Sequence, residues 1–397
     1  MREKVLKSMT IIPDNLYVER NADRQLEANL RDMGRPCCIL VARQMGKTNL
    51  LLRTKRKLES QNDVFVYVDL STYHDTAQEC FRNIIDVAIE LNEELFAQVG
   101  EQIYQRRSQN HFSAVKEHEK ELLMLLKATK GKIVISLDEI DGLVGVPYSD
   151  KIFAQIRSVY FAGRTNHPNE FGRLTYVMAG VLEPTQIIKN KKISPFNIAD
   201  NILLSDFSKE EFLIFLKKAE LHFSKEVSDR IYSWTNGNPR MTWDICSIIE
   251  DKILESKAVT QKDVDLVVRQ TYLTNYDKPP IDHIRELVEK YKDVRDAVKF
   301  LMRNKSEIIS DAMKKQLYLY GITGVKIDSN ESLSIKNQII EECMSLDWIE
   351  SIERQGKSLV VLAQESLENK NYQKTIELII YVAHCLPKQV HYLSTNL

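Results

Sequence analysis

The sequence has no run of about 18 apolar residues, and its first residues, Met1 to Lys7, contain no apolar signal core. We therefore expect neither a membrane-spanning helix nor an export signal. The formal net charge is only -1 at pH 7, so no overall electrostatic field favours a nucleic acid or a membrane as partner. Membrane binding is not expected, and nucleic-acid binding is not indicated.

The six cysteines and eight histidines show no spacing typical of metal ligands. They also form no Ser/His/Asp or Cys/His pattern typical of nucleophilic catalysis. Cys37 and Cys38 are adjacent at the start of an expected buried strand, where free cysteine behaves as a small hydrophobe. We therefore expect a protein of the reducing cytoplasm without a structural metal.

The chain is long for one compact core. It has 397 residues, of which 43% are hydrophobic and 28% charged, as in ordinary globular proteins. It shows no internal repeat and no low-complexity segment. We expect two or three domains.

The most informative stretch runs from Cys38 to Leu51, where an apolar strand enters a tight loop and Gly46-Lys47-Thr48 opens an amphipathic helix. Glycine lets a backbone approach phosphates, Lys47 can reach the β- and γ-phosphates, and the Thr48 hydroxyl can bind Mg2+. Val41 stands where such a loop usually has its first glycine. Gly-Lys-Thr alone is a weak signal, so a nucleotide site is predicted only if a second motif of such a site follows in the sequence.

This second motif is the apolar strand Ile133–Leu137, which ends in the carboxylates Asp138 and Glu139. Asp138 would hold Mg2+, and Glu139 would orient and polarise an attacking water. Alternatively, both acids cap the following helix, as acidic residues often do. Together with the upstream loop, the pair predicts a site for a nucleoside triphosphate.

Strands and helices alternate up to about residue 205, which predicts an α/β domain with a parallel sheet flanked by helices. The strands are expected at 38–41, 63–70, 132–138, 174–179 and 201–204. Helices are expected at 17–34, from the loop to about 60, as two or three helices over 77–129, and at 151–162.

After Asp206 the pattern becomes helical, beginning with the capped start Ser208-Lys209-Glu210-Glu211. We predict a nucleotide-binding domain over 1–205 and an all-α lid domain over 206–278. A winged-helix-like domain follows over 279–344, with a hairpin of strands 321–325 and 333–335, and a helical tail over 345–397 contains helices at 349–369 and 371–385.

In this order, the pieces resemble the AAA-like, STAND-type bacterial P-loop ATPases, which are related to AAA+ proteins and to the nucleotide-switch ATPases of innate immunity. The resemblance covers roughly residues 10 to 345. Beyond Arg43-Gln44-Met45-Gly46-Lys47-Thr48 and Leu137-Asp138-Glu139-Ile140-Asp141, it is carried by segments 17–23, 179–184, 194–198, 204–207, 237–239, 319–322 and 334–337.

The resemblance implies ATP or ADP with Mg2+ as the bound cofactors, and slow ATP hydrolysis. It also implies that the segment before the first strand contacts the adenine, and that the Gly237-Asn238-Pro239 loop lies at the lid. The implied nucleotide-binding residues are Tyr17, Val18, Arg20, Arg43, Gln44, Met45, Gly46, Lys47, Thr48, Asn49 and Pro239. Thr48 and Asp138 would hold the metal, and Glu139 and Lys47 would be catalytic.

One departure from the family pattern concerns the strand 174–179, which should supply a polar residue to the attacking water. Only Thr175 is polar, and Val177 and Met178 lie near the expected place. We therefore expect a slow ATPase that acts as a switch rather than a motor. An arginine from a neighbouring subunit would complete the site, and Arg164 and Arg173 are the candidates, although as loop residues they fit a plain surface role better.

Three functions remain open. The first is an ATP-dependent switch in signalling or antiviral defence, with a homo-oligomer or a protein effector as partner. The second is a DNA-associated AAA+ ATPase of the loader or transposition type, and the third is a nucleotide-binding scaffold with negligible turnover. The basic run Arg53–Lys57 could contact a nucleic acid, but a solvated helix face is the better interpretation. The expected recognition helix 307–320 has only Lys314 and Lys315 as cations, too few for a strong phosphate footprint.

Overall fold

A computed structural model describes residues 3–8, 11–60, 62–72, 74–109, 112–182, 188, 190–255, 258–324, 333–368 and 371–385. The chain folds into two compact units. The first unit is Met9–Ser205, and the second combines Met1–Ser8 with Asp206–Leu397. The predicted domain 1–205 differs from this division in its first eight residues.

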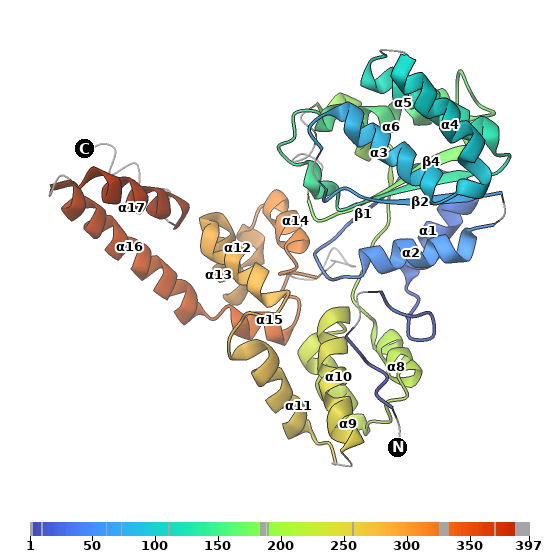
Figure 1. The fold of residues 1–397 in the computed structure, drawn as a ribbon. Helices are drawn as coiled ribbons and strands as arrows, with labels where there is room; N and C mark the ends of the chain where they lie inside the picture. Colours follow the sequence, from blue (N-terminus) through green and yellow to red (C-terminus); the bar gives the residue numbers. More distant parts are fainter. Residues whose placement is uncertain are drawn as a thin grey trace. The chain divides into compact units, whose positions relative to one another are not determined.

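The first unit is built on a five-stranded sheet in the order β2-β3-β4-β1-β5 (Figure 1). All neighbouring strands are parallel. The strands are β1 (Cys37–Leu40), β2 (Val64–Asp69), β3 (Ile133–Asp138), β4 (Leu174–Gly180) and β5 (Asp200–Asn201). Parallel strands covered on both faces need continuous apolar runs, and these runs made the strands predictable.

Helices cover both faces of this sheet. Figure 1 shows α1 and α2 on one side of the strands and α3 to α6 on the other. These helices are α1 (Asn21–Arg31), α2 (Lys47–Leu58), α3 (Ala77–Glu90), α4 (Glu93–Gln109), α5 (Ala114–Ala128) and α6 (Ser149–Ala162). The predicted α/β fold class with a helix-flanked parallel sheet is confirmed.

Two expected elements are shorter than predicted. The first helix begins at Asn21 rather than at residue 17, because Arg20 is its extended N-cap residue and the Asp23 carboxylate accepts the Arg20 N–H. The last strand, expected over 201–204, is the two-residue β5, and Leu203 beyond it is 48% exposed.

Among its described residues, the second unit has helices and one antiparallel bridge, between Thr323 and Ile335. This bridge is the described part of the predicted hairpin, whose residues 325–332 lie outside the described ranges. The helices are α8 (Lys209–Lys218), α9 (Lys225–Thr235), α10 (Pro239–Leu254), α11 (Gln261–Val268), α12 (Ile281–Lys290), α13 (Lys292–Met302), α14 (Asp311–Leu319), α15 (Gln338–Cys343), α16 (Leu346–Glu368) and α17 (Tyr372–Cys385). The finer division at 278 and 344 stays a prediction.

The amino-terminal segment, residues 3–8, docks on α10. The Glu250 carboxylate accepts the backbone N–H groups of Val5 and Leu6 at 2.9 and 2.8 Å, and Lys4 pairs with Asp251 at 2.6 Å. The Leu6 side chain is fully buried. These contacts explain why the first residues belong to the second unit.

Three segments that carried the family resemblance meet at Asp206 in the second unit. Its carboxylate pairs with Lys336 at 3.0 Å and accepts Asn238 Nδ2 at 3.3 Å. Asn337 Nδ2 donates in turn to the Thr235 carbonyl at 3.2 Å. A polar cluster thus joins the first residue of this unit to the N-terminus of α10 and to the segment before α15.

Candidate functional site

The loop between β1 and α2 has the backbone of a phosphate-binding loop. Gly46 is the N-cap of α2 at φ 92°, in the left-handed region that favours glycine. Val41 needs no such freedom, since its φ is not positive and its N–H continues the sheet by donating to the Gly180 carbonyl at 3.1 Å. Valine in place of the usual first glycine is therefore compatible with this loop.

The Lys47 ammonium is buried inside the loop, 3.5 Å from the Val41 carbonyl and 3.4 Å from the Ala42 carbonyl. Burial lowers the pKa of Lys47, and the carboxylates of Glu139, Asp138 and Asp141 partly offset this shift. The first N–H groups of α2 lie beside this cation. A buried cation at a helix N-terminus fits the phosphates of a nucleotide.

Thr48 and Asp138 are in direct contact, although β4 separates β1 from β3 in the sheet. The Thr48 hydroxyl donates to Asp138 Oδ2 at 2.6 Å, and the Tyr67 hydroxyl donates to the same oxygen at 3.0 Å. Asp138 is fully buried. A hydroxyl and a carboxylate are oxygen ligands suited to Mg2+, so these two side chains fit the predicted metal.

Glu139 follows in a left-handed backbone conformation, with φ 51° and ψ 43°. Such strain in a non-glycine residue is often found at functional sites. Partial burial raises the pKa of the Glu139 carboxyl, and Lys47 opposes that shift. Its side chain makes no cap hydrogen bond to the short 3-10 helix η1 (Ile140–Leu143). The capping alternative for Glu139 therefore finds no support in the structure.

The residues expected near the adenine pack beneath the loop. Tyr17, Val18 and Arg20 are buried, and the Tyr17 hydroxyl donates to Asp23 at 2.7 Å. Arg20 Nη1 donates to the Met45 carbonyl at 3.0 Å and to the Ser205 carbonyl at 3.2 Å. These contacts position the loop backbone, and a direct contact with adenine stays a prediction.

The remaining predicted nucleotide-binding residues differ in their surroundings. The Asn49 side chain accepts the Ile12 N–H at 2.7 Å, which fixes the entry segment to α2. Arg43 is exposed, and Gln44 Oε1 is buried without a hydrogen-bond partner. Pro239 is the first residue of α10 in the second unit, so its role also stays a prediction.

The basic run on α2 is neutralised within its own unit. Arg53 pairs with Asp14 and Glu19, Arg56 with Asp14, and Lys57 with Glu19 and Glu27. Lys55 pairs with Glu59 at 3.8 Å. These cations bind the entry segment and α1, which disfavours a nucleic-acid contact at this helix.

The candidate arginines for a neighbouring subunit's site are engaged elsewhere. Arg173 donates to the carbonyls of Asn169, Thr129, Gly131 and Leu126. It precedes β4, whereas the acid pair follows the carboxyl end of β3. Arg164 stacks on the Tyr160 ring and donates to the Tyr160 carbonyl at 3.0 Å. The structure gives both a role within their own unit.

Thr175 is also far from the acid pair. It is paired with Val134, which places it roughly 13 Å along the strands from Asp138 at about 3.3 Å per residue. The carboxyl end of β4 is Ala179 and Gly180. The strand itself therefore brings no polar side chain to the site.

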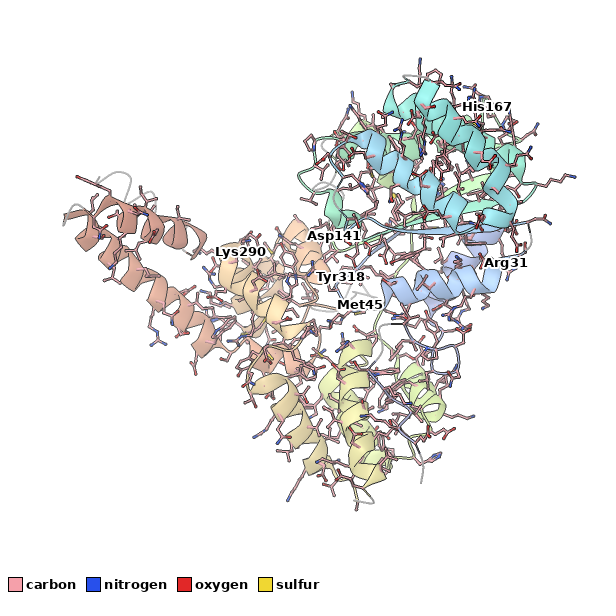
Figure 2. All side chains as sticks on the ribbon, viewed as in Figure 1. Arg31, Met45, Asp141, His167, Lys290 and Tyr318 are labelled. Carbon is pink, nitrogen blue, oxygen red and sulfur yellow. The ribbon has the colours of Figure 1, made fainter. Side chains whose placement is uncertain are left out.

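Two residues at the site were missed by sequence analysis, namely Tyr67 and Asp141. Tyr67 reaches Asp138 from β2, and Asp141 Oδ1 accepts the Val181 N–H at 3.3 Å (Figure 2 labels Asp141). A signal existed for Tyr67, because it lies near the carboxyl end of a strand parallel to β3. Asp141 lies in the motif that carried the resemblance, but nothing in the sequence gave it a role apart from Asp138 and Glu139.

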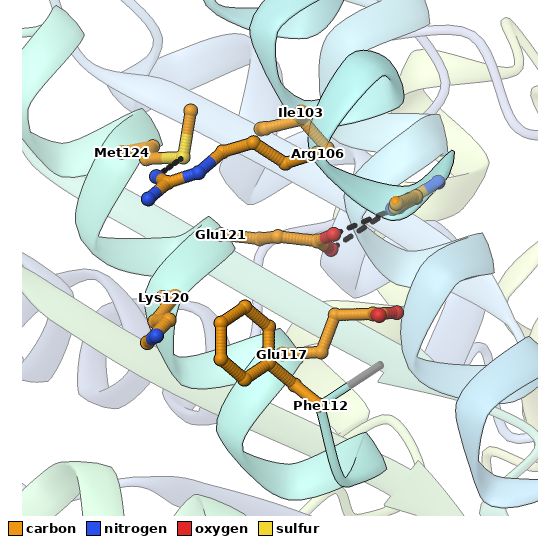
Figure 3. Close-up of a pocket in the computed structure, with 8 residues that line it drawn as sticks. Ile103, Arg106, Phe112, Glu117, Lys120, Glu121 and Met124 are labelled. Atoms are coloured by element: carbon orange, nitrogen blue, oxygen red, sulfur yellow. Dashed lines mark hydrogen bonds and ion pairs between the residues drawn. The ribbon is translucent and has the colours of Figure 1, made fainter. Parts of the chain in front are cut away.

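A separate cavity lies between α4 and α5 (Figure 3). It offers about 20 Å3, enough for about one water molecule. Arg107 pairs there with Glu121 at 2.8 Å and with Asp86 at 2.7 Å. These paired charges hold α3, α4 and α5 together, so the cavity is structural. Among the described residues, no three or more His, Cys, Asp and Glu side chains cluster as ligands of a metal ion.

A model of the AAA-like domain family matches residues 7–322, and the chain belongs to this family. A Walker-type ATPase of Pyrococcus abyssi has a similar structure, with a TM-score of 0.55 at 14% identity over 86% of this chain and 99% of that one. The ORC2 protein of Aeropyrum pernix, solved as ADPNP-ADP complexes, gives 0.54 at 13% identity over 89% and 98%. These likenesses show the fold of a P-loop ATPase.

Two curated relatives match this chain over part of their length. An uncharacterized WD repeat-containing protein of Synechocystis is 27% identical over 91% of this chain and 32% of its own length. An uncharacterized ATP-binding protein of Methanocaldococcus jannaschii is 30% identical over 30% of this chain and 34% of its own. The chain thus spans about a third of each. No described helix is both long and apolar enough to cross a membrane.

Proposed function

We propose that this protein binds ATP with Mg2+, hydrolyses it slowly, and acts as a nucleotide-controlled switch in signalling or defence. The observation that carries the proposal is the contact of Thr48 with Asp138 at 2.6 Å beside the buried Lys47 ammonium. It brings the expected metal ligands and the expected phosphate-binding cation into one place.

The side chains have complementary roles in this proposal. Lys47 and the first amides of α2 hold the β- and γ-phosphates, while Thr48 and Asp138 supply oxygens to Mg2+. A bound Mg2+ would neutralise charge that develops on the phosphoryl oxygens. Glu139 accepts a proton from the attacking water as the new bond to phosphorus forms and the bond to the leaving ADP oxygen breaks.

Slow turnover is supported by what surrounds this site. The carboxyl end of β4 has no polar side chain, and Arg164 and Arg173 are bound to carbonyl oxygens of their own unit. A cation that stabilises the transferred phosphoryl group accelerates such reactions by about 10³ or more. A homo-oligomer that supplies one, or an effector protein, therefore fits the chemistry better than an isolated fast enzyme.

Calorimetry with Mg-ATP and a phosphate-release assay test the chemistry. We expect Lys47→Ala to lose nucleotide binding, whereas Glu139→Gln should bind ATP and lose turnover. An unchanged hydrolysis rate in Glu139→Gln would show that the water-activating carboxylate is wrongly assigned. Absence of binding heat with millimolar ATP would overturn the nucleotide site itself.

The switch role is tested by the mass of the particle in solution, measured with ADP and with a non-hydrolysable ATP analogue. A change from monomer to multimer is expected. The similar Synechocystis protein has WD repeats in a much longer chain, which supports a module that controls other domains. Strong stimulation of hydrolysis by duplex DNA would favour the loader function instead.

A further inference from the structure

Strand β4 lies between the two strands that carry the proposed site. It pairs with β1 through Leu40 and Gly180 and with β3 through Leu137 and Met178. Its carboxyl end therefore lies between the phosphate loop and the acid pair. A side chain at residue 180 would emerge at this point, but the residue is glycine.

Ile140 and Asp141, which follow β3, fill the space that a side chain at residue 180 would need. A Cβ atom on Gly180 would lie 2.6 Å from Ile140 Cγ1 and 3.1 Å from Asp141 Oδ1. The backbone N–H of Val181 donates to the same Asp141 oxygen at 3.3 Å. The Asp141 carboxylate is thus anchored at the end of β4, where a polar side chain of β4 would otherwise be.

Asp141 also acts electrostatically on the two central groups of the site. Its negative charge raises the pKa of Lys47 and the pKa of Glu139, opposing burial at the first and adding to it at the second. At Glu139 this effect exceeds that of the adjacent Asp138. The Asp141 carboxylate therefore lies close enough to Glu139 to raise the pKa of that carboxyl group.

We propose that Asp141 is a positioning residue for the attacking water, and that it provides the polar contact which β4 lacks. The proposal rests on the proposed function. A water molecule has two O–H donors, so two carboxylate acceptors, Glu139 and Asp141, fix the direction of its lone pair. Glu139 takes up the proton, as in the proposed function.

A purely structural role for Asp141 is the competing explanation, since its bond to Val181 joins η1 to β4. The two roles separate in Asp141→Asn, because the amide oxygen can still accept the Val181 N–H while the charge is lost. Asp75→Asn is the matched control, as Asp75 is an exposed carboxylate of the same unit.

The experiment measures single-turnover hydrolysis of Mg-ATP, the affinity for a non-hydrolysable ATP analogue, and the melting temperature. Asp141→Asn should keep the melting temperature and hydrolyse about 10- to 100-fold more slowly, the usual loss for a residue that orients a group of the site. It should bind the analogue at least as tightly as wild type, because a negative charge near the phosphates is gone. Asp75→Asn should match wild type in all three.

Two results would overturn the inference. One is an unchanged hydrolysis rate in Asp141→Asn while Glu139→Gln is inactive, which leaves the proposed function intact. The other is a loss of both melting temperature and affinity, which shows a structural role. If wild type does not bind the analogue, the proposed function itself fails. Gly180→Ala gives an independent check, since its new methyl group must displace Ile140 or Asp141, and hydrolysis should fall as in Asp141→Asn.

Discussion

The Glu139 carboxyl is partly buried beside Lys47, and its environment determines the pH at which it can accept a proton. Burial raises its pKa above the ordinary 4.5, and the repulsion from Asp141 and Asp138 adds to this. A base works only when it is deprotonated. We expect the single-turnover rate to fall about tenfold per pH unit below that raised pKa.

The measurement is a pH profile of the single-turnover rate from 4 to 8, with enzyme in excess over ATP. The affinity of Glu139→Gln for ATP over the same range is the control, since it separates loss of binding from loss of the base. A rate that falls only below pH 4.5 would contradict a base with a raised pKa.

His118 is a second buried group whose titration has a measurable consequence. It is stacked on Phe81 with ring centroids 4.4 Å apart, and its Nδ1 has no hydrogen-bond partner. Burial, with a smaller effect from Arg107, lowers its pKa from 6.5 to about 3. Below pH 6.5 the unfolded chain binds a proton that the folded protein cannot bind, so the free energy of unfolding falls by up to about 1.4 kcal/mol per pH unit.

His118→Phe should remove this part of the slope between pH 6.5 and about 4, because phenylalanine fills the same space without titrating. The check is the melting temperature across that range, compared with His222→Phe, a change at an exposed histidine. Equal slopes in both variants would show that His118 is not the titrating group.

At the residue scale, sequence predicts which element carries a side chain better than it predicts the contacts of that side chain. Lys47, Thr48, Asp138 and Glu139 were predictable because motif spacing and strand ends determine where they lie. Asp141 was not, since its place depends on a hydrogen bond to Val181 and on the space left by Gly180. The family resemblance predicted that Arg20 belongs to the site. It did not predict the hydrogen bonds of Arg20 to the Met45 and Ser205 carbonyls.

At the scale of elements, the amino-terminal segment is an integral part of the second unit. Leu6 is fully buried, Glu250 accepts two of the segment's N–H groups, and the Ser247 hydroxyl donates to the Leu6 carbonyl at 2.6 Å. Burial of one leucine contributes about 2–5 kcal/mol when it is compared with alanine in a core.

We expect Leu6→Ala to detach this segment from α10 and to lower the melting temperature of the second unit. Hydrogen exchange at the Val5 and Leu6 amides should accelerate. Leu213→Ala, at a leucine that is 48% exposed on α8, is the matched control. Equally slow exchange in all three proteins would mean that the segment is held without Leu6.

Elements with a strong internal pattern were predictable, and those that depend on distant partners were not. The strands β1 to β4 have continuous apolar runs, and α8 begins with a capping box at Ser208 and Glu211. Residues 3–8 have few apolar positions and no periodicity, so only the docking on α10 reveals their role. The strand predicted over 201–204 is only the two-residue β5 in the structure, because its pairing with β1 ends at Cys38 and Asn201.

At the scale of the whole molecule, the Ser205–Asp206 peptide bond joins the two units, and side chains bind the backbone or side chain on each side of it. Arg20 binds the Met45 carbonyl of the phosphate loop and the Ser205 carbonyl, the last residue of the first unit. Asp206 follows directly, and its carboxylate binds Lys336 and Asn238 in the second unit. This peptide bond is thus anchored within the first unit by Arg20 and within the second by Lys336 and Asn238.

This arrangement predicts that Lys336→Gln uncouples the two units. Loss of the ion pair leaves Asp206 held only by Asn238, and we expect the looser Asp206 to weaken, through Ser205, the contact of Arg20 with the loop at Met45. We expect fluorescent ADP to dissociate about 2- to 30-fold faster, which corresponds to a coupling free energy of about 0.5–2 kcal/mol. Lys314→Gln, which breaks an exposed pair with Asp311 in the same unit, should leave the rate unchanged.

Lys336 is buried, so Lys336→Gln leaves the Asp206 charge without its partner and can lower stability by itself. The double variant Asp206→Asn with Lys336→Gln removes both charges and is therefore compared with the single variant. If the units are coupled, the double variant should regain stability and still release ADP quickly. A wild-type rate of ADP release in both the single and the double variant would show that nucleotide binding does not depend on the Asp206–Lys336 ion pair.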